Sequence, residues 1–177
     1  MTRTAFTVGG AWLLAVAVMG ACAGCSSSEP KRGYAVPKTL CGVSVPTDAL
    51  SRLLPPSGDH LTVKDNTTVA DAVTGCDVSV DGDMVFSIEK ERIDAGRSAW
   101  NIAAYDRRLV AAQQADGGKV AYAGGQGVTV VSCQEKDNQD EEISVYVRTL
   151  NPGRQDESAL RDFLTRYRGA LGAQRPC

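Results

Sequence analysis

Alternating apolar and polar positions predict two β-hairpins in this chain. Residues 76–92 alternate with period two on either side of Asp81-Gly82, a pair typical of a type I′ turn. Residues 127–150 contain two further alternating runs, which flank the polar connection 134–142. Because period two sends successive side chains to opposite faces of a sheet, each hairpin has one apolar face to bury.

Three other segments have the spacing of amphipathic helices: 47–54, 98–114 and 156–172. Thr47 is placed to cap the first of them, and Pro55 to end it. The apolar stripes consist of Leu50, Leu53 and Leu54 in the first segment, of Ile102, Tyr105, Leu109 and Ala112 in the second, and of Leu160, Phe163, Leu164, Tyr167 and Leu171 in the third. Each stripe predicts one face packed against the sheet.

The order strand, turn, strand, helix therefore occurs twice. It indicates either a distant duplication or the ordinary rhythm of an α+β domain, and the pattern does not choose between them. In both cases we expect one α+β domain over residues 40–177, an antiparallel sheet built of two hairpins with helices packed on it.

The first residues of the chain do not belong to this domain. Arg3 is followed by an uncharged apolar run of about fifteen residues, Ala5 to Met19, and then by small residues. This order is typical of a secretory signal peptide. The run is shorter than the ~20 residues that a membrane-spanning helix needs. We therefore expect residues 1–24 to be a signal peptide.

Small residues precede two cysteines at the end of this segment, Cys22 and Cys25. The stretch resembles a bacterial lipobox, in which the cysteine is acylated on sulfur and becomes the mature N-terminus. Cleavage before Cys22 would leave an odd number of thiols outside the cytoplasm, whereas cleavage before Cys25 leaves four that can all pair. Cys25 is therefore the expected lipidation site and Cys22 the alternative.

The polar, proline-bearing stretch that follows predicts a flexible tether over residues 25–39. Two or more acyl chains, such as palmitate, anchor a protein stably where a single chain does not. The expected location is thus the outer face of the cell membrane.

Cys41, Cys76, Cys133 and Cys177 remain in the mature domain. Because they lack the C-x-x-C spacing of zinc ligands, we expect them to form two disulfides. Of the three possible pairings we favour Cys41–Cys76 and Cys133–Cys177, because each joins neighbouring elements within one half of the chain.

Composition and motifs exclude several functions. Acidic and basic residues are interspersed in similar numbers, 21 against 19, so no basic face for nucleic acid is expected. The glycine-rich segment 117–128 leads into a strand rather than a helix, which favours turns over a phosphate site. The acidic segment 136–142 lacks the ligand spacing of a calcium loop. No cofactor is expected.

Few residues are suited to catalysis. His60 is the only histidine, and its loop lacks a nucleophile motif, so a surface histidine is expected. Asp77, Asp81 and Asp83 are the candidates for a hydrolase that uses paired carboxylates, as glycosidases do.

The motifs "LCG", "CDVSVDG", "VTVVSC" and the terminal "RPC", together with the lipobox and the proline-bearing tether, carry a second resemblance. The chain is similar to a widespread group of actinobacterial exported lipoproteins of unknown function. The resemblance covers most of the mature chain and implies a helix-covered antiparallel sheet and an extracytoplasmic location. It supplies no catalytic residue.

The expected function is therefore that of a membrane-anchored lipoprotein without enzymatic activity. It would bind an envelope protein or a small ligand outside the cytoplasm. A carboxylate-based envelope hydrolase is the alternative.

Overall fold

The computed structural model describes residues 31–68, 73–133 and 140–177. The predicted signal peptide, Cys22, Cys25 and the first part of the predicted tether lie outside the described residues. In the described parts of the chain, no helix has the length and apolar content needed to cross a bilayer.

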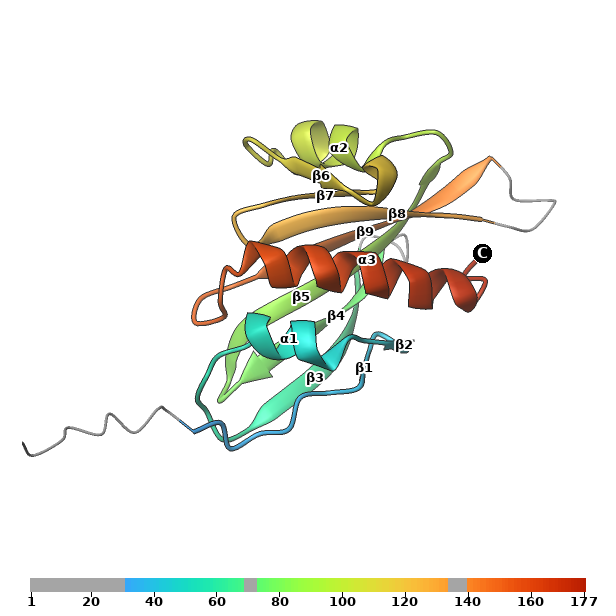
Figure 1. The fold of residues 1–177 in the computed structure, drawn as a ribbon. Coiled ribbons are helices and arrows are strands. Elements are labelled where there is room, and N and C mark those ends of the chain that lie inside the picture. The colour runs from blue at the N-terminus through green and yellow to red at the C-terminus, as the bar shows by residue number, and fades with distance from the viewer. Residues whose placement is uncertain (1–30, 69–72, 134–139) are drawn as a thin grey trace, which may run out of the picture.

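The fold is α+β, with one seven-stranded antiparallel sheet and a separate two-stranded ribbon (Figure 1). The order across the large sheet is β3 (Leu61–Thr68), β4 (Val73–Val80), β5 (Asp83–Asp94), β9 (Glu141–Thr149), β8 (Gln126–Ser132), β7 (Val120–Ala123) and β6 (Gln113–Ala115). The ribbon consists of β1 (Thr39–Leu40) and β2 (Val43–Ser44). The predicted fold class and antiparallel sheet are confirmed.

The sheet is larger than two hairpins, because β3, β6 and β7 add to it. Its two halves meet where β5 pairs with β9, from Phe86 opposite Thr149 to Asp94 opposite Glu141. The strands β3 to β5 form one meander and β6 to β9 the other. The strands missing from the sequence-based prediction are an exposed edge strand, β3, and the short strands β6 and β7, whose alternation is too brief to be recognised.

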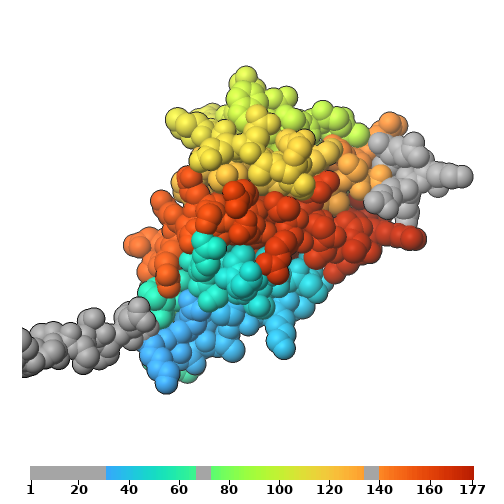
Figure 2. Space-filling view, viewed as in Figure 1, coloured from blue at the N-terminus to red at the C-terminus, as the bar shows by residue number. Residues whose placement is uncertain are grey.

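Helices cover the two faces of the sheet unequally. On one face, α1 (Thr47–Leu53) and α3 (Glu157–Ala173) enclose the main core, and α3 crosses the middle of the molecule between α1 and the strands β6 and β7 (Figures 1 and 2). On the other face, α2 (Ala99–Asn101) and the π-helical turn η1 (Ile102–Asp106) cover a smaller cluster over β7 and β8.

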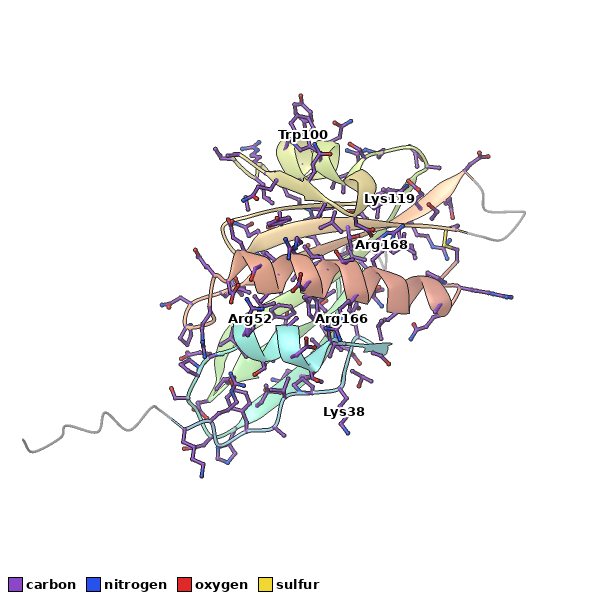
Figure 3. All side chains as sticks on the ribbon, in the orientation of Figure 1. Lys38, Arg52, Trp100, Lys119, Arg166 and Arg168 are labelled. Atoms are coloured by element: carbon purple, nitrogen blue, oxygen red, sulfur yellow. A yellow bond between two sulfur atoms is a disulfide. The ribbon has the colours of Figure 1, made fainter. Side chains whose placement is uncertain are left out.

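Ion pairs at the surface join the two helices of the main face. Arg52 of α1 reaches Asp156 at 2.8 Å, and Arg166 of α3 reaches Asp48 at 2.8 Å (Figure 3). Thr47 does not cap α1 as predicted. Pro46 is the N-cap residue, and α1 has no side-chain cap.

The predicted helix over residues 98–114 is wrong beyond its first turns. Arg108 and Ala111 both have a φ of 55°, which ends helical geometry and turns the chain back to pair as β6. Of the predicted stripe, Ile102 and Leu109 are buried, but the side chain of Tyr105 is 70% exposed. Pairing at the edge of the sheet thus outweighs the local helical pattern.

The glycine-rich segment 117–128 forms turns, as expected, together with a hairpin that was not expected. Gly124 and Gly125 have φ values of 52° and 79° and connect β7 to β8. Gly127 then allows α3 to approach β8 closely, since a Cβ at this position would lie 2.4 Å from Cδ1 of Leu164.

Both expected disulfides are present, Cys41–Cys76 and Cys133–Cys177. The first joins the β1–β2 ribbon to β4. The second joins the residue after β8 to the end of the chain after α3. The favoured pairing is therefore confirmed.

The packed part of the chain begins at Arg32, earlier than the expected boundary at residue 40. Arg32 donates to the carbonyl oxygen of Pro55 at 2.8 Å, and the hydroxyl of Tyr34, a buried residue, donates to the same oxygen at 2.6 Å. These contacts hold residues 32–39, the second part of the predicted tether, against the domain.

Candidate functional site

The aspartates proposed for hydrolysis lie at different places and have different partners. Asp77 accepts a hydrogen bond from Nδ2 of Asn66 at 2.8 Å. Asp81 accepts the backbone N–H of His60 at 2.8 Å and that of Asp59 at 3.1 Å, and these bonds lower the pKa of its carboxyl. Asp83 is exposed at the start of β5. Hydrogen bonds within the fold therefore occupy Asp77 and Asp81, which does not favour their use as a catalytic pair.

His60 lies at the surface, with its side chain 88% exposed, and its Nδ1 is 3.8 Å from Oδ1 of Asp81. Its structural surroundings agree with the expected surface histidine. No nucleophile is hydrogen-bonded to it in the described part of the chain.

The acidic segment 136–142 is described only from Asp140 onward. Glu141 pairs with Arg92 at 2.8 Å. Glu142 is buried and accepts hydrogen bonds from Oγ of Ser132 at 2.7 Å and from the backbone N–H of Gly96 at 3.1 Å. Among the described residues, no three His, Cys, Asp or Glu side chains are grouped to hold a metal ion.

A second polar cluster occupies the outer surface of β5 and β9. Glu89 receives Arg107 at 3.0 Å and Arg148 at 3.1 Å, while both guanidinium groups lie near the ring of Tyr146, at 4.4 and 5.7 Å from its centroid. Arg107 also approaches Glu91 at 3.6 Å, so two carboxylates face the two guanidinium groups and the cluster braces the sheet beside α2.

The aromatic side chains on α2 and η1 form one pair. Trp100 is partly buried and meets the exposed Tyr105 edge to face, with ring centroids 5.8 Å apart (Figure 3). Two rings in this arrangement stabilise the helical turn. They do not form the row of stacking surfaces typical of a carbohydrate site.

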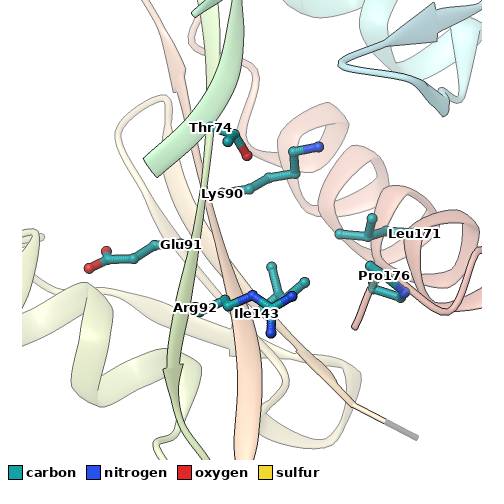
Figure 4. A pocket seen from close by; sticks show the side chains of 7 residues that line it. All are labelled: Thr74, Lys90, Glu91, Arg92, Ile143, Leu171 and Pro176. Carbon is teal, nitrogen blue, oxygen red and sulfur yellow. The ribbon is translucent and has the colours of Figure 1, made fainter. Parts of the chain in front are cut away.

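The strongest candidate site is a cavity of about 450 Å³ between the ends of three strands and the C-terminal end of α3 (Figure 4). We call it the Lys90 pocket. It is lined by Thr74 of β4, Lys90, Glu91 and Arg92 of β5, Ile143 of β9, Leu171 of α3 and Pro176 near the chain end. Its volume lies within the range of about 300–1,000 Å³ typical of small-ligand sites.

The position of Lys90 follows from the pleat of β5. Phe86 and Ile88 point into the main core, so the alternation places Lys90 and Arg92 on the same, α3-facing side of the sheet. Thr74 lies opposite Lys90 in the β4–β5 register. In Figure 4 the side chains of Thr74 and Lys90 lie close together, whereas Glu91 points away to the other side of the strand.

The ammonium group of Lys90 is partly desolvated. Its Nζ donates to the carbonyl oxygen of Cys41 at 3.3 Å, and it has no ion-pair partner among the described residues. Burial lowers the pKa of this amine, and the charge of Asp65 opposes that shift. A titratable group in a cavity whose pKa is shifted by burial and by a nearby charge is a candidate for a functional site.

The rest of the pocket combines a neutralised charge with apolar walls. Arg92 is held by Glu141 at 2.8 Å, so its charge is compensated at the rim. Ile143 and Leu171 are buried core residues whose outer surfaces form the walls, and Pro176 adds to them. The pocket therefore has one available cation beside an apolar surface.

Both disulfides adjoin the pocket. Cys41, whose carbonyl receives Lys90, is bonded to Cys76 in β4. Cys177, which follows the lining residue Pro176, is bonded to Cys133. The two covalent links thus fix residues next to the cavity at two places.

Sequence reasoning did not select Lys90, because the segment Glu89–Arg92 resembles an ordinary charged strand end. The alternation of apolar and polar residues along this strand did contain a signal for Lys90. If the period-two pattern of Phe86 and Ile88 is continued, it places Lys90 on the buried face.

Comparison with known protein families, with characterised proteins and with solved structures finds no match to this chain. The candidate site accordingly rests on its own geometry and chemistry.

Proposed function

We propose that this chain is an extracytoplasmic lipoprotein, anchored through Cys25, that binds a small ligand in the Lys90 pocket without transforming it. The observation that carries the proposal is the ammonium of Lys90, partly buried in a cavity and without a direct ion pair among the described residues. The signal-peptide pattern, the lipobox-like cysteines and the resemblance to actinobacterial lipoproteins support the location. Two disulfides agree with an oxidising compartment.

The site favours binding over catalysis. Its lining offers a cation, a hydroxyl and apolar walls, whereas acid–base catalysis needs a positioned proton donor and acceptor. The aspartates of the hydrolase alternative have other partners, so we do not propose that activity.

The anchor would hold the domain close to the membrane. Six residues separate Cys25 from Arg32, where packing begins. Fully extended, this connection spans at most about 25 Å. The proposed ligand therefore belongs to the outer surface of the membrane or to the space next to it.

The anchor is tested by two serine substitutions in cells. Cys25→Ser should release the protein from the membrane fraction because the acylated sulfur is lost, whereas Cys22→Ser should leave it attached. The readout is the distribution between membrane and soluble fractions after cell breakage. Retention of Cys25→Ser with release of Cys22→Ser would assign the anchor to Cys22, and retention of both variants would refute a lipid anchor at either residue.

Ligand binding is tested in intact cells with a photo-crosslinking amino acid at Arg92, a lining residue at the rim of the pocket. The matched control carries it at Thr62, an exposed residue of β3 on the opposite face of the sheet. We expect a small-molecule adduct, detected by mass spectrometry of the intact protein, at position 92 and not at 62. Adducts at neither position, or equally at both, would contradict ligand binding in this pocket.

A further inference from the structure

Three features of the Lys90 pocket restrict what it can bind: its one cation without a direct ion pair, its hydroxyl group and its apolar walls. We infer that its ligand is a small organic monocarboxylate with an aliphatic body, whose carboxylate binds Nζ of Lys90 and the hydroxyl of Thr74. This inference rests on the proposed function and specifies its ligand class.

The charge of the ligand follows from the balance of charges in the cavity. Arg92 is already paired with Glu141, and Glu91 points to the other face, where it approaches Arg107 at 3.6 Å. Lys90 has no direct ion pair among the described residues, and the more distant charge of Asp65 offsets it only in part, so a monoanion is the ligand charge that fits. A dianion such as phosphate would bring a second negative charge for which the lining has no free partner.

The hydrogen-bonding groups also fit a carboxylate. An ammonium group has three donors, and in Lys90 one of them is used by the carbonyl of Cys41. Two donors remain, and the hydroxyl of Thr74 lies opposite on the adjacent strand. Together they can serve both oxygens of a carboxylate. The attraction is stronger here than in bulk water because part of the solvent is excluded.

The apolar walls require an aliphatic part in the ligand. Leu171 and Pro176 lie across the cavity from Lys90, and Ile143 lies beside Arg92 on the sheet (Figure 4). Burying a methylene group contributes about 0.8 kcal/mol. Each methylene added to the ligand should therefore tighten binding about fourfold, until the cavity is filled.

The test measures binding of butyrate, hexanoate, hexanol and hexylamine to the full chain, isolated from the membrane in a non-ionic detergent. Chemical-shift changes of backbone amides report both affinity and position. We expect hexanoate to shift the amides of the pocket lining, to bind more tightly than butyrate, and to bind more tightly than hexanol or hexylamine.

Lys90→Met keeps the length of the side chain and removes its charge. It should weaken hexanoate binding by about 10- to 100-fold, the usual range for losing a hydrogen bond to a charged group. Lys64→Met is the matched control, because Lys64 is an exposed lysine on the other face of the sheet. It should leave binding unchanged. A thermal melt of each variant establishes that both are folded.

The outcomes separate this inference from the proposed function. Binding of hexanol or hexylamine in the pocket as tight as that of hexanoate, or unchanged hexanoate binding by Lys90→Met, would overturn the monocarboxylate class and leave ligand binding intact. If no probe shifts the pocket amides, the carboxylate inference fails, and the crosslinking at Arg92 decides the proposed function independently. Displacement of hexanoate by an equal concentration of inorganic phosphate would also contradict the inference that the ligand is a monocarboxylate.

Discussion

Asp156 shows how much of the fold depends on single side chains at element ends. Its Oδ1 accepts the backbone N–H of Ala159 at 3.0 Å and so caps α3. The same carboxylate receives the guanidinium of Arg52 from α1. One residue thus begins a helix and links it to another helix that lies far away in the sequence.

Replacing Asp156 with alanine should lower the free energy of unfolding by about 1 kcal/mol at pH 7, the usual effect of losing a helix cap. Asp156→Asn keeps a capping oxygen and loses only the charge, so its penalty should be smaller. Urea unfolding of both variants checks this. Equal penalties would show that the ion pair with Arg52, rather than the cap, carries the effect.

The same residue predicts a pH dependence. The hydrogen bond from Ala159, followed by the contacts with Arg52 and Ser158, lowers the pKa of Asp156 below its usual range. A carboxyl with a depressed folded-state pKa stabilises the fold above its unfolded pKa and loses that effect as the pH falls through the folded value. The difference between wild type and Asp156→Ala should therefore shrink when unfolding is repeated below about pH 4.

At the scale of elements, α3 is the segment whose sequence and structure agree best. Its predicted stripe, from Leu160 to Leu171, is buried against the sheet along its whole length. The segment 98–114 has a similar period but forms only α2 and η1 before turning back. The elements that lie next to each segment explain why α3 is a full helix and the segment 98–114 is not. α3 packs on a broad face of the sheet, whereas residues 113–115, at the end of the segment 98–114, form β6 and pair with β7.

Gly169 lies on the exposed side of α3, and a Cβ added there meets no atom within 4 Å. Gly169→Ala should therefore raise the free energy of unfolding by about 0.5–1 kcal/mol, because alanine restricts the unfolded chain and favours the helix. Thermal unfolding measures the change. The matched variant is Gly127→Ala, whose Cβ would press on Leu164 and should destabilise. A Gly169→Ala protein no more stable than wild type would contradict the placement of this residue within an open helical surface.

At the scale of the whole molecule, the two disulfides join elements that the sheet alone does not hold. Cys41 and Cys76 are 35 residues apart, and Cys133 and Cys177 are 44 residues apart. Loops of this length correspond to about 4 kcal/mol each in the loop-entropy model. Each link is therefore comparable with a large part of the stability of a typical domain.

Removing either link as a pair, by Cys41→Ala with Cys76→Ala or by Cys133→Ala with Cys177→Ala, should lower the free energy of unfolding by about 2–4 kcal/mol. Urea unfolding of the two double variants measures this. The two losses should be similar because the loops are similar in length. A loss below about 1 kcal/mol in both would show that packing, rather than loop closure, provides most of the stability.

Local patterns in the sequence determined the elements whose signal is contained within one segment. The Asp81-Gly82 turn, the stripe of α3 and the pairing of cysteines within each half are of this kind. The proposed anchor at Cys25 also comes from the sequence alone.

Only the tertiary structure decided how the halves join and where the candidate site lies. The pairing of β5 with β9 places Ile143 opposite Arg92, two residues along β5 from Lys90, and α3 then places Leu171 across the cavity from Lys90. Periodicity shows which face of a strand is apolar, but it does not specify the neighbouring strand. A pocket assembled from β4, β5, β9 and α3 is therefore defined by contacts between segments that are distant in sequence, and no single segment carries its pattern.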